Sequence, residues 1–387
     1  MAPPRRSGAE AAVLLLLLLL TTSSVGAARA SSPRVPAVIV FGDSTVDTGN
    51  NNQIPTPLRA DFPPYGRDMP GGPRATGRFG NGRLPPDLIS EALGLPPLVP
   101  AYLDPAYGID DFARGVCFAS AGTGIDDATA GVLSVIPLWK EVEYYEEYQQ
   151  RLRARLGPRR AAAVVRGALH VVSIGTNDFL ENYFLLATGR FAEFTVPEYE
   201  DLLVDGARAF LARIHRLGAR RVTFAGLAAI GCLPLERTAN ALRGGECVEE
   251  FNEVARSYNA KVRDMVRGLR GELPELKLAY ISVYESFLNL IADPAKAGER
   301  GGGVLRHGQV RDGAHVQRRR AADLRRRRQV PLLGRVPPHG EGEPAHGQPH
   351  ARSMLPGGRP VTMSGHVAMN GPVDRGGNEI TCITKDF

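Results

Sequence analysis

The stretch FGDSTVDTGNNN, from Phe41 to Asn52, follows the apolar run Ala37 to Val40 and turns at once to polar residues. A short apolar run that ends in turn residues is typical of a strand buried on both faces of a sheet. The polar residues after it have two interpretations. Asp43, Ser44 and Thr45 can cap a following helix, which the Asp-Ser pair alone favours, or Ser44 can be a nucleophile at the end of the strand.

Strand-like and helix-like segments alternate along the chain after this point. Further strands are predicted at Leu169–Ile174, Val222–Ala225 and Leu276–Val283. Helical periodicity occurs at Lys140–Leu156, Pro197–Leu217 and Glu249–Leu273. This alternation predicts an α/β fold, a three-layer α/β/α sandwich with a mainly parallel sheet. Ligands bind such sheets at the carboxyl ends of the strands. We therefore expect the loops that follow Ala37–Val40, Leu169–Ile174 and Val222–Ala225 to lie at one edge of the sheet.

The first 30 residues are expected to be a secretory signal peptide. Arg5 and Arg6 precede the apolar run Ala11–Leu20, and Ala28-Arg29-Ala30 is a small-x-small cleavage site. The apolar run is roughly half the length that a membrane-spanning helix needs. No later segment is long and apolar enough to span a bilayer. The sequence therefore predicts a secreted, extracellular protein without a transmembrane segment.

The four cysteines fit an oxidising compartment. Cys232 and Cys247 are close enough in sequence to close a short surface loop, and we predict that they form a disulfide. Cys117 lies in the apolar run GVCFAS, where a buried free thiol is at least as well supported as a reactive one.

The net charge of +6 comes from one segment. Between Arg300 and Arg352 twelve arginines stand against four acidic residues, a balance of +8 that leaves −2 for the rest of the chain. No aromatic residue occurs between Phe287 and Phe387. A segment so basic and so poor in large apolar groups is expected to be disordered. A nucleic-acid or membrane-binding arm is disfavoured, because the segment lacks interleaved aromatic residues and an amphipathic pattern.

The opening stretch resembles the first block of the plant GDSL esterase/lipase family, within the SGNH hydrolases. Four further blocks follow in the family's order: GRFGNGRLPPDLI (Gly77–Ile89), GVCFASAGTGID (Gly115–Asp126), VVSIGTNDFLENY (Val171–Tyr183) and GLAAIGCLPLER (Gly226–Arg237). The resemblance implies a flavodoxin-like hydrolase domain over residues 31–298, followed by an aberrant tail over residues 299–387.

The resemblance also implies site residues. Ser44 would be the nucleophile and would give its backbone N–H to the oxyanion. Gly122 would give a second backbone N–H, and Asn177 a side-chain amide. A turn is the alternative role for Asn177. Asp178 and the run Asn50–Asn52 are expected to shape the loops. No G-x-S-x-G elbow, H-E-x-x-H motif or phosphate loop occurs, so neither a metal nor another cofactor is implied.

The family's last block, Asp-x-x-His-Pro, supplies the general base and is absent from the sequence. Asp312 and His315 fit Asp-x-x-His, but the proline is missing and no apolar residues surround them. This pair is therefore disfavoured as the catalytic pair. Codons for Val330–Glu343 can be chosen so that dropping one nucleotide gives Tyr-Leu-Phe-Trp-Asp-Ala-Phe-His-Pro-Thr-Glu-Lys-Val. The same shift turns Gly303–Gln309 into Gly-Cys-Cys-Ala-Thr-Gly-Lys. A frameshift near Gly298 to Gly303 therefore explains the tail.

Together these features predict a secreted carboxylic ester hydrolase, which we expect to be a monomer. It would cleave acyl or acetyl esters of lipids or wall polymers through an acyl-enzyme on Ser44, with no nucleic-acid partner. The alternative is a catalytically inactive secreted binding protein, which keeps the cleft but has lost the base.

Overall fold

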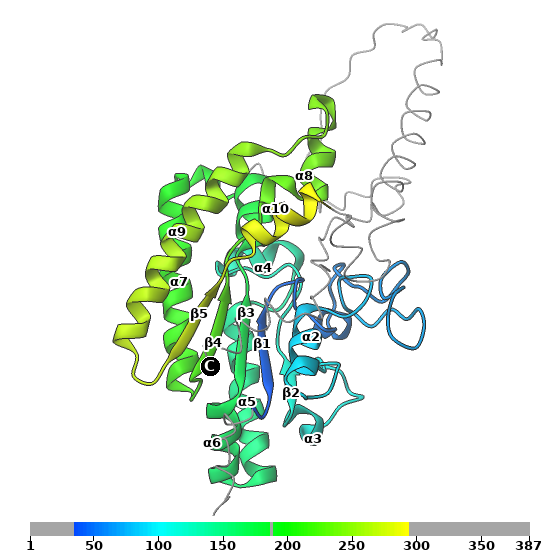
Figure 1. Ribbon diagram of the computed structural model, residues 1–387, viewed down its shortest axis with the longest axis vertical. Helices are drawn as coiled ribbons and strands as arrows, with labels where there is room; N and C mark the ends of the chain where they lie inside the picture. Colours follow the sequence, from blue (N-terminus) through cyan, green and yellow to red (C-terminus); the bar gives the residue numbers. More distant parts are fainter. Residues whose placement is uncertain (1–34, 186–188, 294–387) are drawn as a thin grey trace, which may run out of the picture. The chain divides into compact units, whose positions relative to one another are not determined.

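One five-stranded parallel sheet organises the chain. The computed structural model describes residues 35–185 and 189–293, so the predicted signal peptide and the tail lie outside the described residues. The strands are β1 (Val38–Gly42), β2 (Gly115–Cys117), β3 (Leu169–Ser173), β4 (Arg221–Ala225) and β5 (Lys277–Ile281). Their order is β2-β1-β3-β4-β5, and every neighbouring pair is parallel (Figure 1). The parallel sheet predicted from the sequence is confirmed. Strand β2 was not predicted, because three residues are too few to show a periodicity.

Helices fill the connections between the strands. They are α2 (Pro85–Ala92), α3 (Ile109–Phe112), α4 (Asp127–Leu133), α5 (Leu138–Leu156), α6 (Pro158–Gly167), α7 (Val196–Arg216), α8 (Pro234–Ala239), α9 (Glu249–Glu272) and α10 (Tyr284–Ala292). A π-helix covers Asp178–Leu185, and 3-10 turns occur at Asn50–Gln53, Arg190–Ala192, Ile230–Cys232 and Asn240–Arg243. The three helices predicted from periodicity correspond to α5, α7 and α9. None of the described helices is long and apolar enough to cross a membrane.

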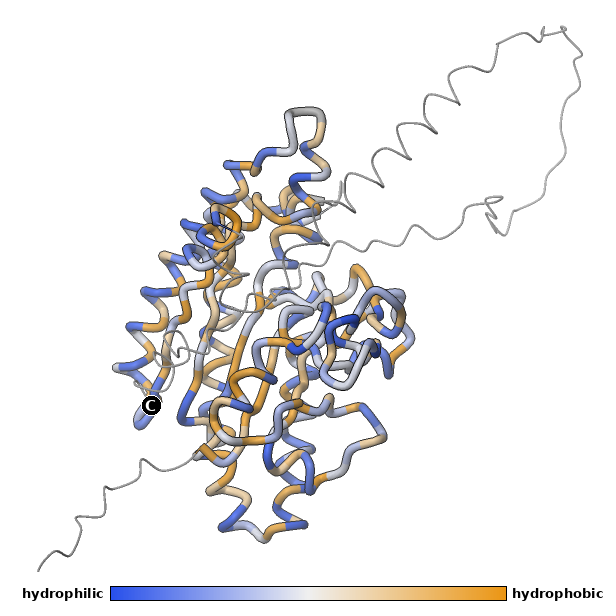
Figure 2. The backbone as a smooth tube through the Cα atoms, turned by 45° about the vertical axis from the view of Figure 1, so that its right-hand side comes forward, coloured by the Kyte–Doolittle hydropathy of each residue, from blue (hydrophilic) through white to orange (hydrophobic). Residues whose placement is uncertain are grey.

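The strand order determines which face of the sheet each helix covers. The chain moves from β1 outward to β2, then back across β1 to β3, β4 and β5. Right-handed crossovers therefore place α2 on one face and α5, α7 and α9 on the other. The ring of Phe41 in β1 confirms this placement for α5 and α7, because it packs against Tyr145 of α5 with a centroid distance of 5.3 Å and against Phe210 of α7 at 5.5 Å. In Figure 2 the strands are mainly apolar, whereas the helices carry hydrophilic residues at intervals.

The two ends of the sheet differ in what surrounds them. Figure 1 shows α4, α8 and α10 at the upper end of the sheet and α6 at the lower end. The π-helix and α10 follow β3 and β5, so the upper end holds the carboxyl ends of the strands. The stretch after β1 lies at this end, where parallel sheets bind their ligands.

The predicted disulfide is present, and it closes the segment that contains α8. Cys232 and Cys247 are joined across a sequence separation of 15 residues, and Cys117 is a buried free thiol. We expect Cys247→Ser to lower the free energy of unfolding by about 3 kcal/mol, because the unfolded chain gains the entropy of an open loop. Denaturant titration of the purified variant measures this loss. Dithiothreitol should lower the stability of the unmodified chain equally, and an unchanged midpoint under both treatments would contradict the prediction.

Candidate active site

Three loops meet at the carboxyl edge because β2, β1 and β3 are neighbours. Gly42 at the end of β1 is in register with Ser173 at the end of β3. The N–H of Asp43 donates to the carbonyl oxygen of Ser173 at 3.0 Å, and the N–H of Ser120 donates to that of Gly42 at 2.8 Å. The predicted site residues follow these anchors within two to four positions: Ser44, Gly122 and Asn177. The structure thus places all three at one edge.

Ser44 lies in a tight turn that its neighbours hold. One carboxylate oxygen of Asp43 accepts hydrogen bonds from the N–H of Thr45 at 2.9 Å and from its hydroxyl at 2.6 Å. The hydroxyl of Thr45 also lies 2.8 Å from that of Ser173. No α-helix follows directly, and among the described residues the hydroxyl of Ser44 has no hydrogen-bond partner. Asp43 therefore shapes the turn, and the Ser44 hydroxyl is left free for chemistry.

The asparagines after this turn fasten the loop that carries Gly122. The side-chain amide of Asn50 donates to the carbonyl oxygens of Cys117 at 2.9 Å and Ala119 at 2.8 Å. Asn51 donates to that of Ala121 at 2.9 Å, and a carboxylate oxygen of Asp47 accepts from the Ala121 N–H at 3.1 Å. The expectation that this run shapes the loops is confirmed for Asn50 and Asn51.

Gly122 occupies a position that a side chain would disturb. Its φ is +83°, in the left-handed region that favours glycine. A Cβ atom there would lie 2.7 Å from Cδ2 of Leu58. The glycine therefore lets the backbone turn tightly at the edge of the sheet, two residues after the Ser120 anchor.

Asn177 is buried and points toward the Gly122 loop. Its side-chain nitrogen donates to the carbonyl oxygen of Thr123 at 2.8 Å. A carboxamide nitrogen carries two hydrogens, so this bond fixes the side chain and leaves one hydrogen for another acceptor. Asn177 is thus more than a turn residue, because it joins the loop after β3 to the loop after β2.

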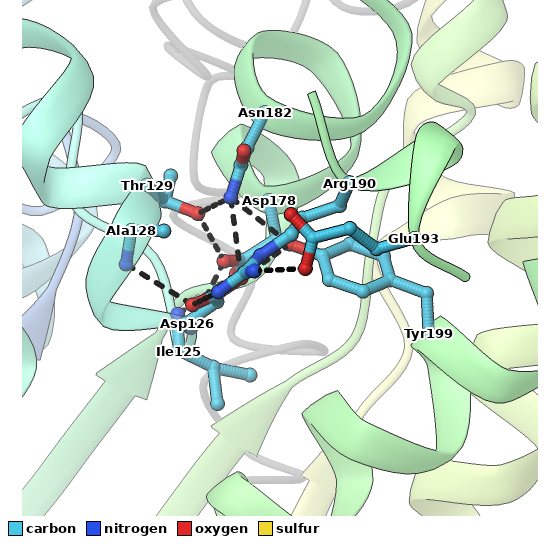
Figure 3. A network of polar contacts seen from close by, with 9 residues as sticks. All are labelled: Ile125, Asp126, Ala128, Thr129, Asp178, Asn182, Arg190, Glu193 and Tyr199. Carbon is cyan, nitrogen blue, oxygen red and sulfur yellow. Dashed lines mark hydrogen bonds and ion pairs between the residues drawn. The ribbon is translucent and has the colours of Figure 1, made fainter. Parts of the chain in front are cut away.

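Figure 3 shows the polar network that locks these two loops together. The buried carboxylate of Asp178 accepts from the N–H of Ile125 at 2.8 Å, the N–H of Asp126 at 3.1 Å and the hydroxyl of Thr129 at 2.7 Å. The guanidinium group of Arg190 donates two hydrogen bonds to the carboxylate of Asp126, at 2.7 and 3.1 Å. The loop-shaping role expected for Asp178 is confirmed. The contact between Arg190 and Asp126 could not be predicted, because the two residues are 64 positions apart.

Buried carboxyl groups surround the turn that carries Ser44. Glu141 of α5 accepts from the N–H of Gly42 at 2.9 Å, and burial raises its pKa well above the usual value. Burial likewise raises the pKa of Asp43 to about 6. In Glu181 the Oε2 atom is buried without a hydrogen-bond partner among the described residues, and burial, with Asp43 and Asp178 nearby, raises the pKa to about 8. The sequence pattern could not reveal that these carboxyl groups are buried, because each is one polar residue among many.

The raised pKa of Glu181 makes stability depend on pH. The folded chain keeps this proton up to about pH 8, whereas an unperturbed glutamic acid releases it near pH 4.5. The contribution of the Glu181 proton to the free energy of unfolding is therefore complete below pH 4.5, and it is lost as the pH rises through 8. We expect Glu181→Gln to raise the free energy of unfolding at pH 8 by on the order of 1–3 kcal/mol and to change it little at pH 5. Thermal melts at both pH values measure this, with the exposed Glu253→Gln as the control. Equal effects at the two pH values would contradict the prediction.

Neither histidine in the described part of the chain can serve Ser44. His170 lies near the start of β3, where its ring contacts the Tyr145 hydroxyl at 3.0 Å and the Arg221 carbonyl oxygen at 3.2 Å. Burial lowers its pKa to about 4, so it is a neutral core residue. His215, at the end of α7, contacts the carbonyl oxygen of Pro274 at 2.9 Å. Both belong to the amino-terminal end of the sheet. The pair Asp312 and His315 lies outside the described residues.

The chain is similar in sequence to proteins of one known family. The family model for GDSL-like lipases and acylhydrolases matches residues 38–320. Three GDSL esterase/lipases of Arabidopsis thaliana are similar to the chain: one is 55% identical over 261 residues, which is 67% of this chain and 74% of the relative. The others are 54% and 52% identical over 265 residues, 68% of this chain and 75% of each relative. The solved structure of a carbohydrate esterase aligns with 72% of this chain and 72% of its own chain, at 13% identity and a TM-score of 0.32.

Proposed function

Since the chain belongs to the GDSL-like lipase/acylhydrolase family, and is by family a carboxylic ester hydrolase, we propose that Ser44 is its nucleophile. The observation that carries this proposal is the meeting of three loops at the carboxyl edge, which brings the Ser44 turn and the fixed Asn177 amide to the same edge of the sheet. We propose further that the enzyme is secreted and acts as a monomer on acyl or acetyl esters of lipids or wall polymers. The disulfide between Cys232 and Cys247 supports an oxidising compartment.

The proposed reaction follows from the groups at the edge. The Ser44 hydroxyl oxygen attacks the ester carbonyl carbon while a base removes its proton, and the carbonyl oxygen becomes an oxyanion. The backbone N–H groups of Ser44 and Gly122 and the second amide hydrogen of Asn177 would stabilise that oxyanion. The base then protonates the leaving alcohol, and water hydrolyses the acyl-enzyme in a second step. Asp178 acts indirectly, by holding the Gly122 and Asn177 loops in place.

The oxyanion role of Asn177 predicts a kinetic effect. We expect Asn177→Ala to lower kcat by about 100-fold to 1,000-fold while KM changes little, because the amide would act mainly on the transition state. Hydrolysis of p-nitrophenyl butyrate measures both constants in an enzyme with a working base. Asn240→Ala, at a partly exposed position in a different loop, is the control. A rise in KM with unchanged kcat would instead assign Asn177 to ground-state binding.

We propose that the missing base was lost through a frameshift near Gly298 to Gly303, in the gene or in its description. The histidines of the described residues are remote from Ser44, and the shifted frame restores an Asp-x-x-His-Pro sequence. Sequencing the transcript across the codons for Ala297–Glu343 tests this directly. One nucleotide more or fewer than the chain implies places the frameshift in the description of the gene. Exact agreement leaves it in the gene itself, and the frameshift is rejected if the transcript, read one nucleotide later, encodes no Asp-x-x-His-Pro sequence.

A second candidate function is a secreted binding protein without catalysis. The absence of a histidine near Ser44 among the described residues favours it for the chain with the printed sequence. This protein would bind an ester without turning it over. Saturable binding of a slowly hydrolysed ester, with no product release and a transcript that matches the chain, would select this candidate over the hydrolase.

A further inference from the structure

A cavity at the far end of the sheet from Ser44 has an unusual lining. It has a volume of about 250 Å³ and lies between α5, α6 and the turn that joins α7 to β4. Its lining includes the apolar residues Ala161, Val165 and Leu217 and four arginines: Arg153, Arg166, Arg216 and Arg220. No acidic residue is among the residues that line it. The cavity therefore combines an apolar wall with several positive charges.

The arginines are only partly neutralised by their surroundings. Arg166 forms an ion pair with Glu275, and the Nε atom of Arg220 lies 3.7 Å from the same carboxylate. Arg153 donates to the neutral side chain of Gln149 at 3.1 Å. The side chain of Arg216 makes no hydrogen bond or ion pair with residues in the described ranges. One carboxylate, that of Glu275, thus pairs with two of the four guanidinium groups.

Arginines at helix ends have a simpler explanation, because cations there offset the partial negative charge of the last carbonyls. At the end of α7 that need is met by other groups. The carbonyl oxygens of His215 and Ala219 accept from Arg220 at 2.7 and 2.8 Å, and that of Leu217 accepts from Gln149 at 3.0 Å. Helix capping therefore accounts for Arg220. Arg153 and Arg216 lie in the last turns of α5 and α7, where the helix dipole favours a cation, but neither guanidinium is paired with a carboxylate among the described residues, so both stay available to an anion.

We infer that this cavity binds an amphiphilic anion, a phosphate or carboxylate head group on a short apolar chain. Guanidinium groups bind both head groups through paired hydrogen bonds, with Arg153 and Arg216 as the available donors. The apolar chain would lie against Ala161, Val165 and Leu217, where burial of its methylene groups adds to the affinity. The site is separate from the carboxyl edge, so its occupancy does not depend on Ser44.

Titration calorimetry on the full chain tests the inference, with octyl phosphate and octanoate as probes below their micelle concentrations. We expect saturable 1:1 binding of at least one probe. The affinity should be at least about tenfold lower in an Arg153→Gln/Arg216→Gln variant, because two hydrogen-bonding contacts to a charged head group are lost. Arg159→Gln, an exposed arginine of α6 that does not line the cavity, should bind as the unmodified chain does. The better probe identifies the head group.

Three results would overturn the inference. Neither probe binds, the double variant binds as tightly as the control, or the uncharged octyl glucoside binds as well as the anions. Equal affinity for octyl phosphate and inorganic phosphate would reject the apolar part of the site. A Ser44→Ala variant should bind the probes unchanged, so failure of this inference is distinguishable from failure of the proposed hydrolase.

Discussion

A frame-restored chain is expected to hydrolyse p-nitrophenyl butyrate at least about 1,000-fold faster than the chain with the printed sequence. In the frame-restored chain, the codons from near Gly303 onward are read one nucleotide later. The reason is the base: a serine nucleophile without one loses several orders of magnitude in rate and keeps only what oxyanion donors and binding supply. The structure shows the Ser44 turn and the Asn177 amide in place but no histidine near them among the described residues. Steady-state kinetics on both purified chains measure the ratio.

Residues 299–387 of the chain as given contain one alternative base, His315, and a variant of that chain tests it. If Asp312 and His315 supplied the catalytic pair, the printed chain would already be active and His315→Ala would remove that activity. We expect instead that His315→Ala leaves the low rate of the printed chain unchanged. Comparable rates in the printed and restored chains, with loss of both rates on removal of His315, would contradict the frameshift.

In the frame-restored chain, Ser44→Ala is expected to lower kcat by about 10,000-fold or more, since no covalent intermediate can form without the hydroxyl. The fold should survive, because the Ser44 hydroxyl makes no hydrogen bond among the described residues and the turn is held by Asp43 and Thr45. Hydrolysis of p-nitrophenyl butyrate and a thermal melt on the same preparation measure both consequences. Thr45→Val is a useful comparison, because it changes the turn and keeps the nucleophile. Unchanged turnover with an intact fold in Ser44→Ala would reject the assignment of the nucleophile.

The sheet could be predicted from the sequence because its central strands are short apolar runs that end in turn residues. Ala37–Val40 and Val222–Ala225 carry this signal locally, and the long helices carry a clear 3.6-residue periodicity. The rule that parallel sheets bind ligands at their carboxyl ends then placed Ser44 and the loop of Asn177 at one edge. The disulfide followed from the short spacing of Cys232 and Cys247.

A loop-shaping role was expected for Asp178, but the particular contacts that support the site could not be predicted, because they join distant segments. Asp178 reaches the backbone of Ile125 across 53 positions, and Glu141 reaches the N–H of Gly42 across 99. A carboxylate on an amphipathic helix is usually solvated, and nothing local marks Glu141 as fully buried. The left-handed backbone of Gly122 was likewise invisible in the sequence, although the family resemblance singled out the residue.

The central claim is that Ser44 carries the acyl group during ester hydrolysis. Acid quenching of the frame-restored chain with a slowly deacylated ester, followed by peptide mass spectrometry, tests it most directly. We predict an added acyl mass on the peptide that contains Ser44, absent from the Ser44→Ala variant. Acylation of another residue, or turnover with no adduct on this peptide under conditions that trap acyl-enzymes, would contradict the account.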